Sequence, residues 1–140
     1  MKSISIWKAW LIGTGIICSI YLAWNICVLM ATKNAWIAPI LYVLYPIGWV
    51  APPIAAFLVA YLAPKRKILA GSSMAVSAAV MLGLFGDLWD RFGNGGDFHG
   101  LDGYMAVLAL GLTWNALVCL PGALAGYYAA LKKQRKDVQA

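Results

Sequence analysis

The fold is decided by residues 36–67, WIAPILYVLYPIGWVAPPIAAFLVAYLAPKRK, where a long uncharged segment runs into a basic cluster. The first 28 residues of this stretch contain no Asp, Glu, Lys, Arg or His. As an α-helix they would extend about 42 Å, which exceeds the ~30 Å hydrocarbon core of a bilayer. Four prolines interrupt the segment, and each internal proline removes a backbone donor and clashes with the preceding turn. We therefore predict a membrane-spanning helix over 36–63 that is kinked or unwound between Pro46 and Pro53.

The surplus length of this segment leaves a second arrangement open. Residues 36–45 could lie in the outer membrane interface while residues 46–63 span the bilayer alone. The kinked single span is the arrangement we predict. In either case, the carbonyls freed by the prolines need partners from neighbouring helices, side chains or water.

The rest of the chain shows the same pattern of uncharged segments between short charged ends. Of its 140 residues, 63% are hydrophobic and 11% charged, whereas ordinary soluble domains are roughly 45–50% apolar and about 25% charged. We predict an all-α, polytopic membrane protein, a four-transmembrane-helix bundle that forms a single domain over residues 1–140. The expected spans are 6–30, 36–63, 68–89 and 104–131, with an outer loop at 90–103 and a basic cytoplasmic tail at 132–140.

The distribution of basic residues predicts the orientation of this bundle. Nine of the 11 Lys and Arg residues fall at the N-terminus, in the loop after the second span or in the tail, and the other two are Lys33 and Arg91. An excess of Lys and Arg marks the cytoplasmic side. We expect both termini to be cytoplasmic, with the protein in a bacterial inner membrane. The net charge of +6 then suits anionic lipid, and no nucleic-acid partner is expected.

Small residues recur at four-residue steps in the third and fourth expected spans. Such small-xxx-small ridges let another helix approach closely. The ridge residues are Gly71, Ala75, Ala79 and Gly83 in the third span, and Gly122, Gly126 and Ala130 in the fourth. We expect them to pack against each other, against a second copy of the chain or against a larger membrane partner. Near the first ridge, the hydroxyls of Ser73 and Ser77 can bond back to the preceding helical turn.

Two amides are the most polar residues well inside the expected spans. Asn25 and Asn115 each follow a tryptophan, and the cost of facing lipid should turn both into the bundle. They could form hydrogen bonds between helices, which is the simpler interpretation, or line a path for a solute. Asp87, at the outer end of the third span, is either a solvated helix end or part of such a path.

Other potentially reactive residues predict no cofactor and no metal site. The cysteines Cys18, Cys27 and Cys119 lie inside apolar segments without a C-x-x-C pair. The Asp/Gly-rich loop departs from EF-hand spacing, and the single histidine, His99, lies in that loop, whereas haem needs histidines inside the spans. Hydrolase, Walker and zinc-protease motifs are also missing from the sequence. We therefore expect a protein that is not an enzyme.

Two functions remain as hypotheses. The first is a non-enzymatic accessory or helix-packing subunit, which uses the small-residue ridges and has few ionisable residues in its core. The second is a small-solute or ion transporter or channel, lined by Asn25, Asn115 and Asp87, with the proline-broken span as part of the path.

Overall fold

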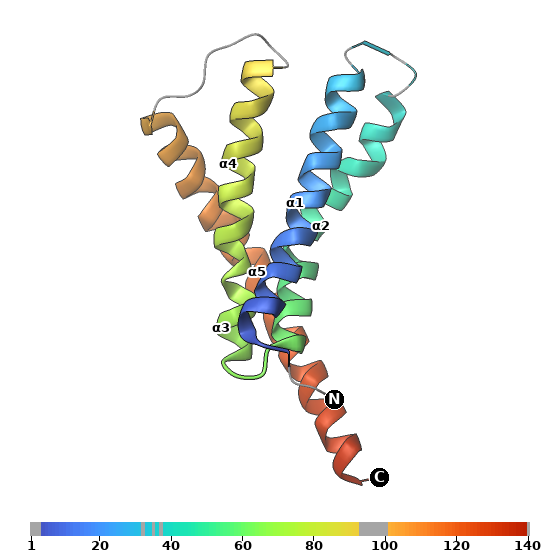
Figure 1. Cartoon of the computed structure of the whole chain (residues 1–140), viewed down its shortest axis with the longest axis vertical. Helices are drawn as coiled ribbons and strands as arrows, with labels where there is room; N and C mark the ends of the chain where they lie inside the picture. Colours follow the sequence, from blue (N-terminus) through green and yellow to red (C-terminus); the bar gives the residue numbers. More distant parts are fainter. Residues whose placement is uncertain (1–3, 32, 35, 37, 93–100, 140) are drawn as a thin grey trace.

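The computed structural model describes residues 4–31, 33–34, 36, 38–92 and 101–139. Within these residues the fold is all-α (Figure 1). The helices are α1 (Ile6–Ala31), α2 (Ala38–Leu62), α3 (Lys67–Ser72), α4 (Met74–Phe92) and α5 (Leu101–Gln139). Four helical segments are long and apolar enough to cross a membrane: Ile6–Ala31, Pro39–Leu62, Lys67–Phe85 and Gly103–Asp137. The predicted fold class is confirmed.

Helix α2 is bent in its proline-rich region, as the sequence predicts. It contains Pro46, Pro52 and Pro53 in its interior. Residues 38–45 belong to the same helix as residues 46–62. The second span is therefore the kinked single helix and not a separate interfacial segment followed by a short span.

The third span differs from the continuous helix expected over 68–89. It consists of α3 and α4, which meet at Ser73. The Ser73 hydroxyl donates to the Ala70 carbonyl at 2.8 Å, and such back-bonding within a turn weakens regular helical pairing. Ser77 does not bond back as expected. Its hydroxyl lies 3.1 Å from the Thr14 hydroxyl and links α4 to α1.

The end of α2 is fixed by a lysine from the start of α3. Lys67 Nζ donates to the carbonyl of Tyr61 at 3.1 Å and to the carbonyl of Ala63. A cation near the last carbonyls of a helix satisfies acceptors that have no intrahelical donor. Arg66, in the connection, adopts a left-handed backbone conformation with φ 49°.

Helices α4 and α5 extend further than the sequence analysis expects. Helix α4 continues to Phe92 and α5 begins at Leu101, so both ends of the predicted loop 90–103 are helical. The middle of that loop, residues 93–100 with His99, lies outside the described residues. Helix α5 also continues through residues 132–139, and its 39 residues extend about 58 Å at 1.5 Å each. The basic residues of this end, 132–136, are exposed.

The small-residue ridges pack inside the chain. Gly122 and Gly126 of α5 lie directly against the carbonyls of Pro53 and Phe57 in α2. Gly71 of α3 lies where an added Cβ would come within 2.6 Å of the Ala56 carbonyl and 2.7 Å of the Ala123 Cβ. The third-span residues Ala75 and Ala79 are buried, and Gly83 packs against the ring of Tyr104. The closest approach of the fourth-span ridge is thus to α2, and α2 packs most extensively against α5.

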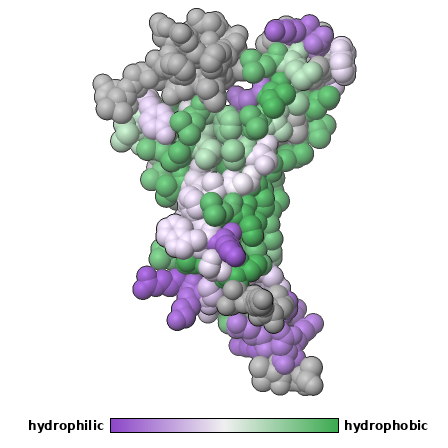
Figure 2. Space-filling model, viewed as in Figure 1, coloured by the Kyte–Doolittle hydropathy of each residue, from purple (hydrophilic) through white to green (hydrophobic). Residues whose placement is uncertain are grey.

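The helices converge at one end of the molecule and separate at the other (Figure 1). Both termini lie at the converging end, where α1, α2 and the α3–α4 pair pack closely. At that end, Gly13 of α1 faces Val59 and Met74 so closely that a Cβ would lie 2.6 Å from the Met74 sulfur. Toward the other end, α1 and α2 diverge from α4 and α5. The face of the molecule in Figure 2 is largely hydrophobic over its middle, with hydrophilic residues toward both ends.

Candidate functional site

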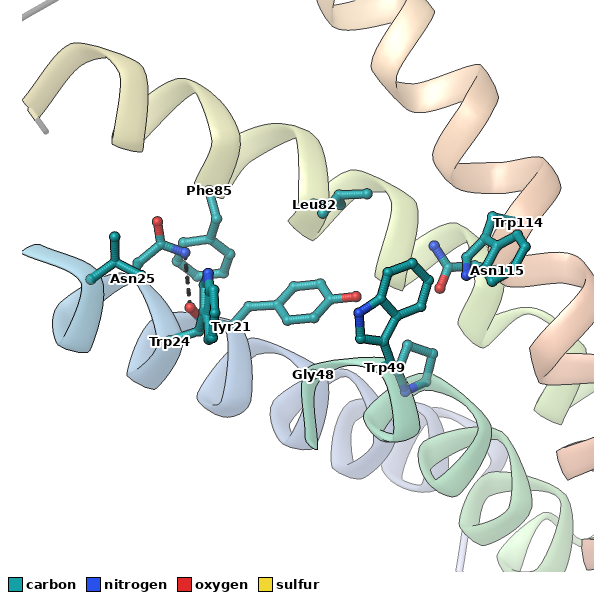
Figure 3. Close-up of a pocket in the computed structure, with 11 residues that line it drawn as sticks. Tyr21, Trp24, Asn25, Gly48, Trp49, Leu82, Phe85, Trp114 and Asn115 are labelled. Carbon is teal, nitrogen blue, oxygen red and sulfur yellow. Dashed lines mark hydrogen bonds between the residues drawn. The ribbon is translucent and has the colours of Figure 1, made fainter. Parts of the chain in front are cut away.

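A cavity of about 460 Å³ lies between the diverging halves of the bundle. All four spans contribute to its wall (Figure 3). The lining residues are Tyr21, Trp24, Asn25 and Val28 of α1, Gly48, Trp49 and Pro52 of α2, Leu82 and Phe85 of α4, and Trp114 and Asn115 of α5. We refer to this cavity as the cleft. Because every lining residue lies within a candidate span, the cleft lies within the part of the molecule suited to hydrocarbon.

Two aromatic pairs connect the two halves of the bundle across the cleft. Tyr21 of α1 and Phe85 of α4 are perpendicular, with ring centroids 6.3 Å apart. Trp49 of α2 and Trp114 of α5 form a second edge-to-face pair, with centroids 5.4 Å apart and an interplanar angle of 87°. Edge-to-face rings attract because the positive edge of one meets the negative face of the other. The pairs therefore stabilise the helices at the distance that leaves the cleft between them.

The two asparagines of the cleft are oriented by their own helices. Asn25 Nδ2 donates to the Tyr21 carbonyl at 2.9 Å, and Asn115 Nδ2 donates to the Gly111 carbonyl at 2.7 Å. A backbone carbonyl only accepts hydrogen bonds, so each amide must turn its nitrogen toward its helix. Within the described part of the chain, neither amide oxygen has a hydrogen-bond partner. These two oxygens are therefore acceptors that remain for a ligand or water.

The bend of α2 supplies a third acceptor at the cleft. In a helix the carbonyl of Gly48 would accept from residue 52, or from residue 53 in a π-type turn. Both positions are prolines, which have no backbone N–H. Gly48 and Pro52 line the cleft. The proline pair therefore leaves the Gly48 carbonyl, which belongs to a residue of the cleft wall, without either of these donors.

The hydroxyl of Tyr21 completes the polar part of the wall. Figure 3 shows the Tyr21 ring extending from α1 toward Trp49, with Asn115 reaching toward the same region from α5. Among the residues described, the Tyr21 hydroxyl has no hydrogen-bond partner. It can donate or accept. The cleft wall therefore carries one hydroxyl, two amide oxygens and the indole N–H groups of its three Trp residues on a mainly apolar surface.

The structure brings together some of the residues singled out in the sequence. Asn25 and Asn115, 90 positions apart in the chain, line the same cleft. Asp87 lies in α4, two positions after the lining residue Phe85, but its side chain is outside the described part of the structure. The ridge glycines lie elsewhere, in the helix contacts described above. Sequence reasoning missed Tyr21, Trp49 and Trp114, for which the available signal was their position near Asn25, the prolines and Asn115.

The chemistry of the cleft is that of a binding site. None of the 11 lining residues is Asp, Glu, Lys, Arg or His. Throughout the described residues, no three His, Cys, Asp or Glu side chains come together as potential metal ligands. A cavity of this size with an apolar wall and a few convergent polar groups is typical of sites for small organic molecules.

Comparisons with protein families, with characterised proteins and with solved structures find no match for this chain. A functional assignment therefore has to be argued from the cleft itself.

Proposed function

We propose that this membrane protein is a small-solute transporter whose binding site is the cleft, and that it is not an enzyme. The observation that carries this proposal is the placement of Asn25 and Asn115 on one cavity lined by all four spans. Buried amides that serve only to hold helices together would form hydrogen bonds to a neighbouring helix. Instead, each amide bonds to its own helix and leaves its oxygen without a partner among the described residues.

The broken backbone of α2 supports the same proposal. Irregular backbone at membrane depth is tolerated where it is buried in protein or lines a cavity, and transporters place substrate sites at such helix breaks. In this chain the consecutive prolines Pro52 and Pro53 fall where α2 borders the cleft. A proline pair used only to bend the helix could lie on any face, whereas this pair removes the α-helical donors to the carbonyls of Gly48 and Trp49, two residues that line the same cavity as the amides.

The distribution of charge supports a proposed orientation. We place both termini on the cytoplasmic side of a bacterial inner membrane, because nine of the 11 Lys and Arg residues lie toward that side of the predicted topology. The termini lie at the converging end of the bundle (Figure 1). The diverging end, and with it the cleft, then faces the cell exterior or periplasm.

Filling the cleft tests the proposal. Gly48 lines the cleft, and an added Cβ there meets nothing within 4 Å. The Cβ of a leucine at this wall position would therefore meet no protein atom, and we expect its side chain to take up cleft volume. Gly15 of α1 is a matched control, since its Cβ position is equally open but lies outside the cleft wall. Gly48→Leu should remove solute binding, and Gly15→Leu should leave it unchanged.

The measurement is equilibrium dialysis of the protein in lipid nanodiscs against 4-bromobenzyl alcohol and 4-bromobenzyltrimethylammonium, with bound bromine counted by elemental mass spectrometry. Saturable binding of at least one probe that Gly48→Leu abolishes is the expected result. If neither probe saturates, or if both glycine variants bind like the wild type, the cleft is not a solute site.

The accessory-subunit function stays a prediction, but the packing removes its main motivation. Gly71, Gly122 and Gly126 contact helices of the same chain, so these positions are not open to a homo-oligomer or larger partner. Crosslinking in native membranes tests this function directly. Recovery of one stoichiometric partner would favour it over solute transport.

A further inference from the structure

We infer that the solute of the cleft is a weakly hydrated organic cation of the quaternary ammonium type. This inference rests on the proposed transport function and specifies its substrate class. The negative face of an aromatic ring attracts a cation placed over it, and aromatic cages recognise quaternary ammonium groups in this way. The cleft combines such rings with acceptors, and none of the 11 described residues of its wall is charged.

The aromatic part of the wall comes from all four spans. It consists of Tyr21, Trp24, Trp49, Phe85 and Trp114. Trp has the strongest cation–π attraction of the aromatic side chains, and three of the five rings are Trp. Because Tyr21–Phe85 and Trp49–Trp114 meet edge to face, with interplanar angles of 90° and 87°, the two rings of a pair cannot stack on each other. In each pair, the ring that contributes its edge does not place either of its own faces against its partner.

The asparagines and the bent backbone of α2 add oxygen acceptors to the wall. Asn25 and Asn115 direct their amide nitrogens to backbone carbonyls, which leaves the oxygens for the cleft. The Gly48 carbonyl adds another acceptor because residues 52 and 53 are prolines. Carbonyl oxygens and ring faces are both electron-rich, so their potentials add at a cation and oppose an anion.

Two of the positive side chains that the structure describes are held away from this wall. Lys67 is held at the end of α2 by the carbonyls of Tyr61 and Ala63, and Lys133 lies 5.9 Å from the Tyr61 ring centroid. None of the lining residues is Lys or Arg. A small inorganic cation would need its whole hydration shell replaced by oxygens. A cavity of about 460 Å³ with mainly carbon walls suits a larger cation whose charge is surrounded by methyl groups.

A pair of probes with the same shape tests the sign of charge alone. The cation is 4-bromobenzyltrimethylammonium, and the neutral isostere is 1-bromo-4-neopentylbenzene, in which carbon replaces nitrogen. Nonspecific partition into the nanodisc is measured with Gly48→Leu and subtracted. We expect the cation to bind about 10-fold more tightly than the isostere, which corresponds to one or two desolvated cation–π contacts. Equal or tighter binding of the isostere would overturn the cation inference while leaving a solute-binding cleft in place. If neither probe bound above the Gly48→Leu background, the proposed function would be overturned as well.

Tryptophan substitutions test whether the rings create the preference. Trp49→Leu and Trp114→Leu should each reduce the ratio of cation to isostere affinity about threefold or more. Trp7→Leu and Trp36→Leu are controls, since both side chains are 74% exposed and lie outside the cleft wall. The ratio is informative because a variant that merely distorts the cleft weakens both probes together. An unchanged ratio in both cleft variants contradicts the aromatic basis of the inference.

Discussion

Individual glycines in this protein differ in what a methyl group would meet. At Gly126 an added Cβ would collide with the Phe57 carbonyl, and at Gly122 with the Pro53 carbonyl. At Gly15 the same Cβ would meet nothing within 4 Å. Backbone atoms cannot rotate away as a flexible side chain can, so α5 and α2 would have to move apart to admit a side chain on α5.

Gly126→Ala should therefore destabilise the bundle by about 1–3 kcal/mol, as overpacking of a close contact does. Gly15→Ala should leave stability unchanged or raise it by up to about 1 kcal/mol, since alanine favours a helix over glycine. The measurement is reversible unfolding in mixed micelles with increasing denaturing detergent, followed by circular dichroism. Equal stabilities of the two variants would show that α5 does not pack against α2 through this glycine.

The sequence predicts the polar residues of the cleft better than the aromatic ones. Asn25 and Asn115 can be singled out because an amide is costly in lipid and few residues in the spans are as polar. Tyr21, Trp49 and Trp114 cannot, because aromatic residues are common in membrane helices and their partners lie on other spans. The sequence also does not show whether the oxygen or the nitrogen of each side-chain amide stays available. That depends on the hydrogen bonds of the two amide nitrogens to the carbonyls of Tyr21 and Gly111.

At the scale of the helix, the prolines of α2 have different surroundings. Pro52 is fully buried and lines the cleft, whereas Pro46 is exposed. Pro52 removes the α-helical donor to the Gly48 carbonyl, and Pro53 removes that to the Trp49 carbonyl. Pro46 removes one donor, that for the carbonyl of Tyr42, a residue that does not line the cleft. Only the proline pair therefore changes the chemistry of the cleft wall.

The double variant Pro52→Ala/Pro53→Ala should restore these donors and straighten α2. We expect binding of 4-bromobenzyltrimethylammonium to weaken about 10-fold, because one acceptor is lost and Trp49 moves relative to Trp114. Pro46→Ala should stay within about twofold of the wild type. Equilibrium dialysis in nanodiscs measures both, and circular dichroism checks helix content. Wild-type affinity in the double variant would mean that the bend serves packing and not binding.

The sequence predicts that the membrane helices exist better than it predicts the residues at which they begin and end. The charge-free lengths predict the four helices that are long and apolar enough to cross a membrane, because transfer into hydrocarbon depends on composition over about 20 residues. The bond from the Ser73 hydroxyl back to the preceding turn is anticipated from the sequence, but the helix break at Ser73 is not, since the contacts of Gly71 with α2 and α5 cannot be predicted from it. The helical extension of α5 to Gln139 is missed for another reason. Basic residues mark the end of a span but are good helix formers.

For the whole molecule, close packing at one end and separation at the other suggest how a solute could cross. The converging end of the bundle is held together by the close contact of Gly13 with Met74 and by the hydrogen bond between Thr14 and Ser77. A transporter must open this converging end at some stage of its cycle, whereas a static binding protein need not. A covalent link that holds the converging end closed therefore distinguishes a transporter from a static binding protein.

The Thr14 and Ser77 hydroxyl oxygens lie 3.1 Å apart, so cysteines at both positions are close enough to form a disulfide between α1 and α4. The native cysteines at 18, 27 and 119 are first replaced by alanine in every variant. Thr14→Cys/Ser77→Cys should, when oxidised, bind 4-bromobenzyltrimethylammonium with wild-type affinity but transport it into proteoliposomes at least about 10-fold more slowly. Reduction should restore the flux, and Thr14→Cys alone should respond to neither treatment. If the crosslinked protein transports at the full rate, the converging end does not open and the solute must take a path that avoids it.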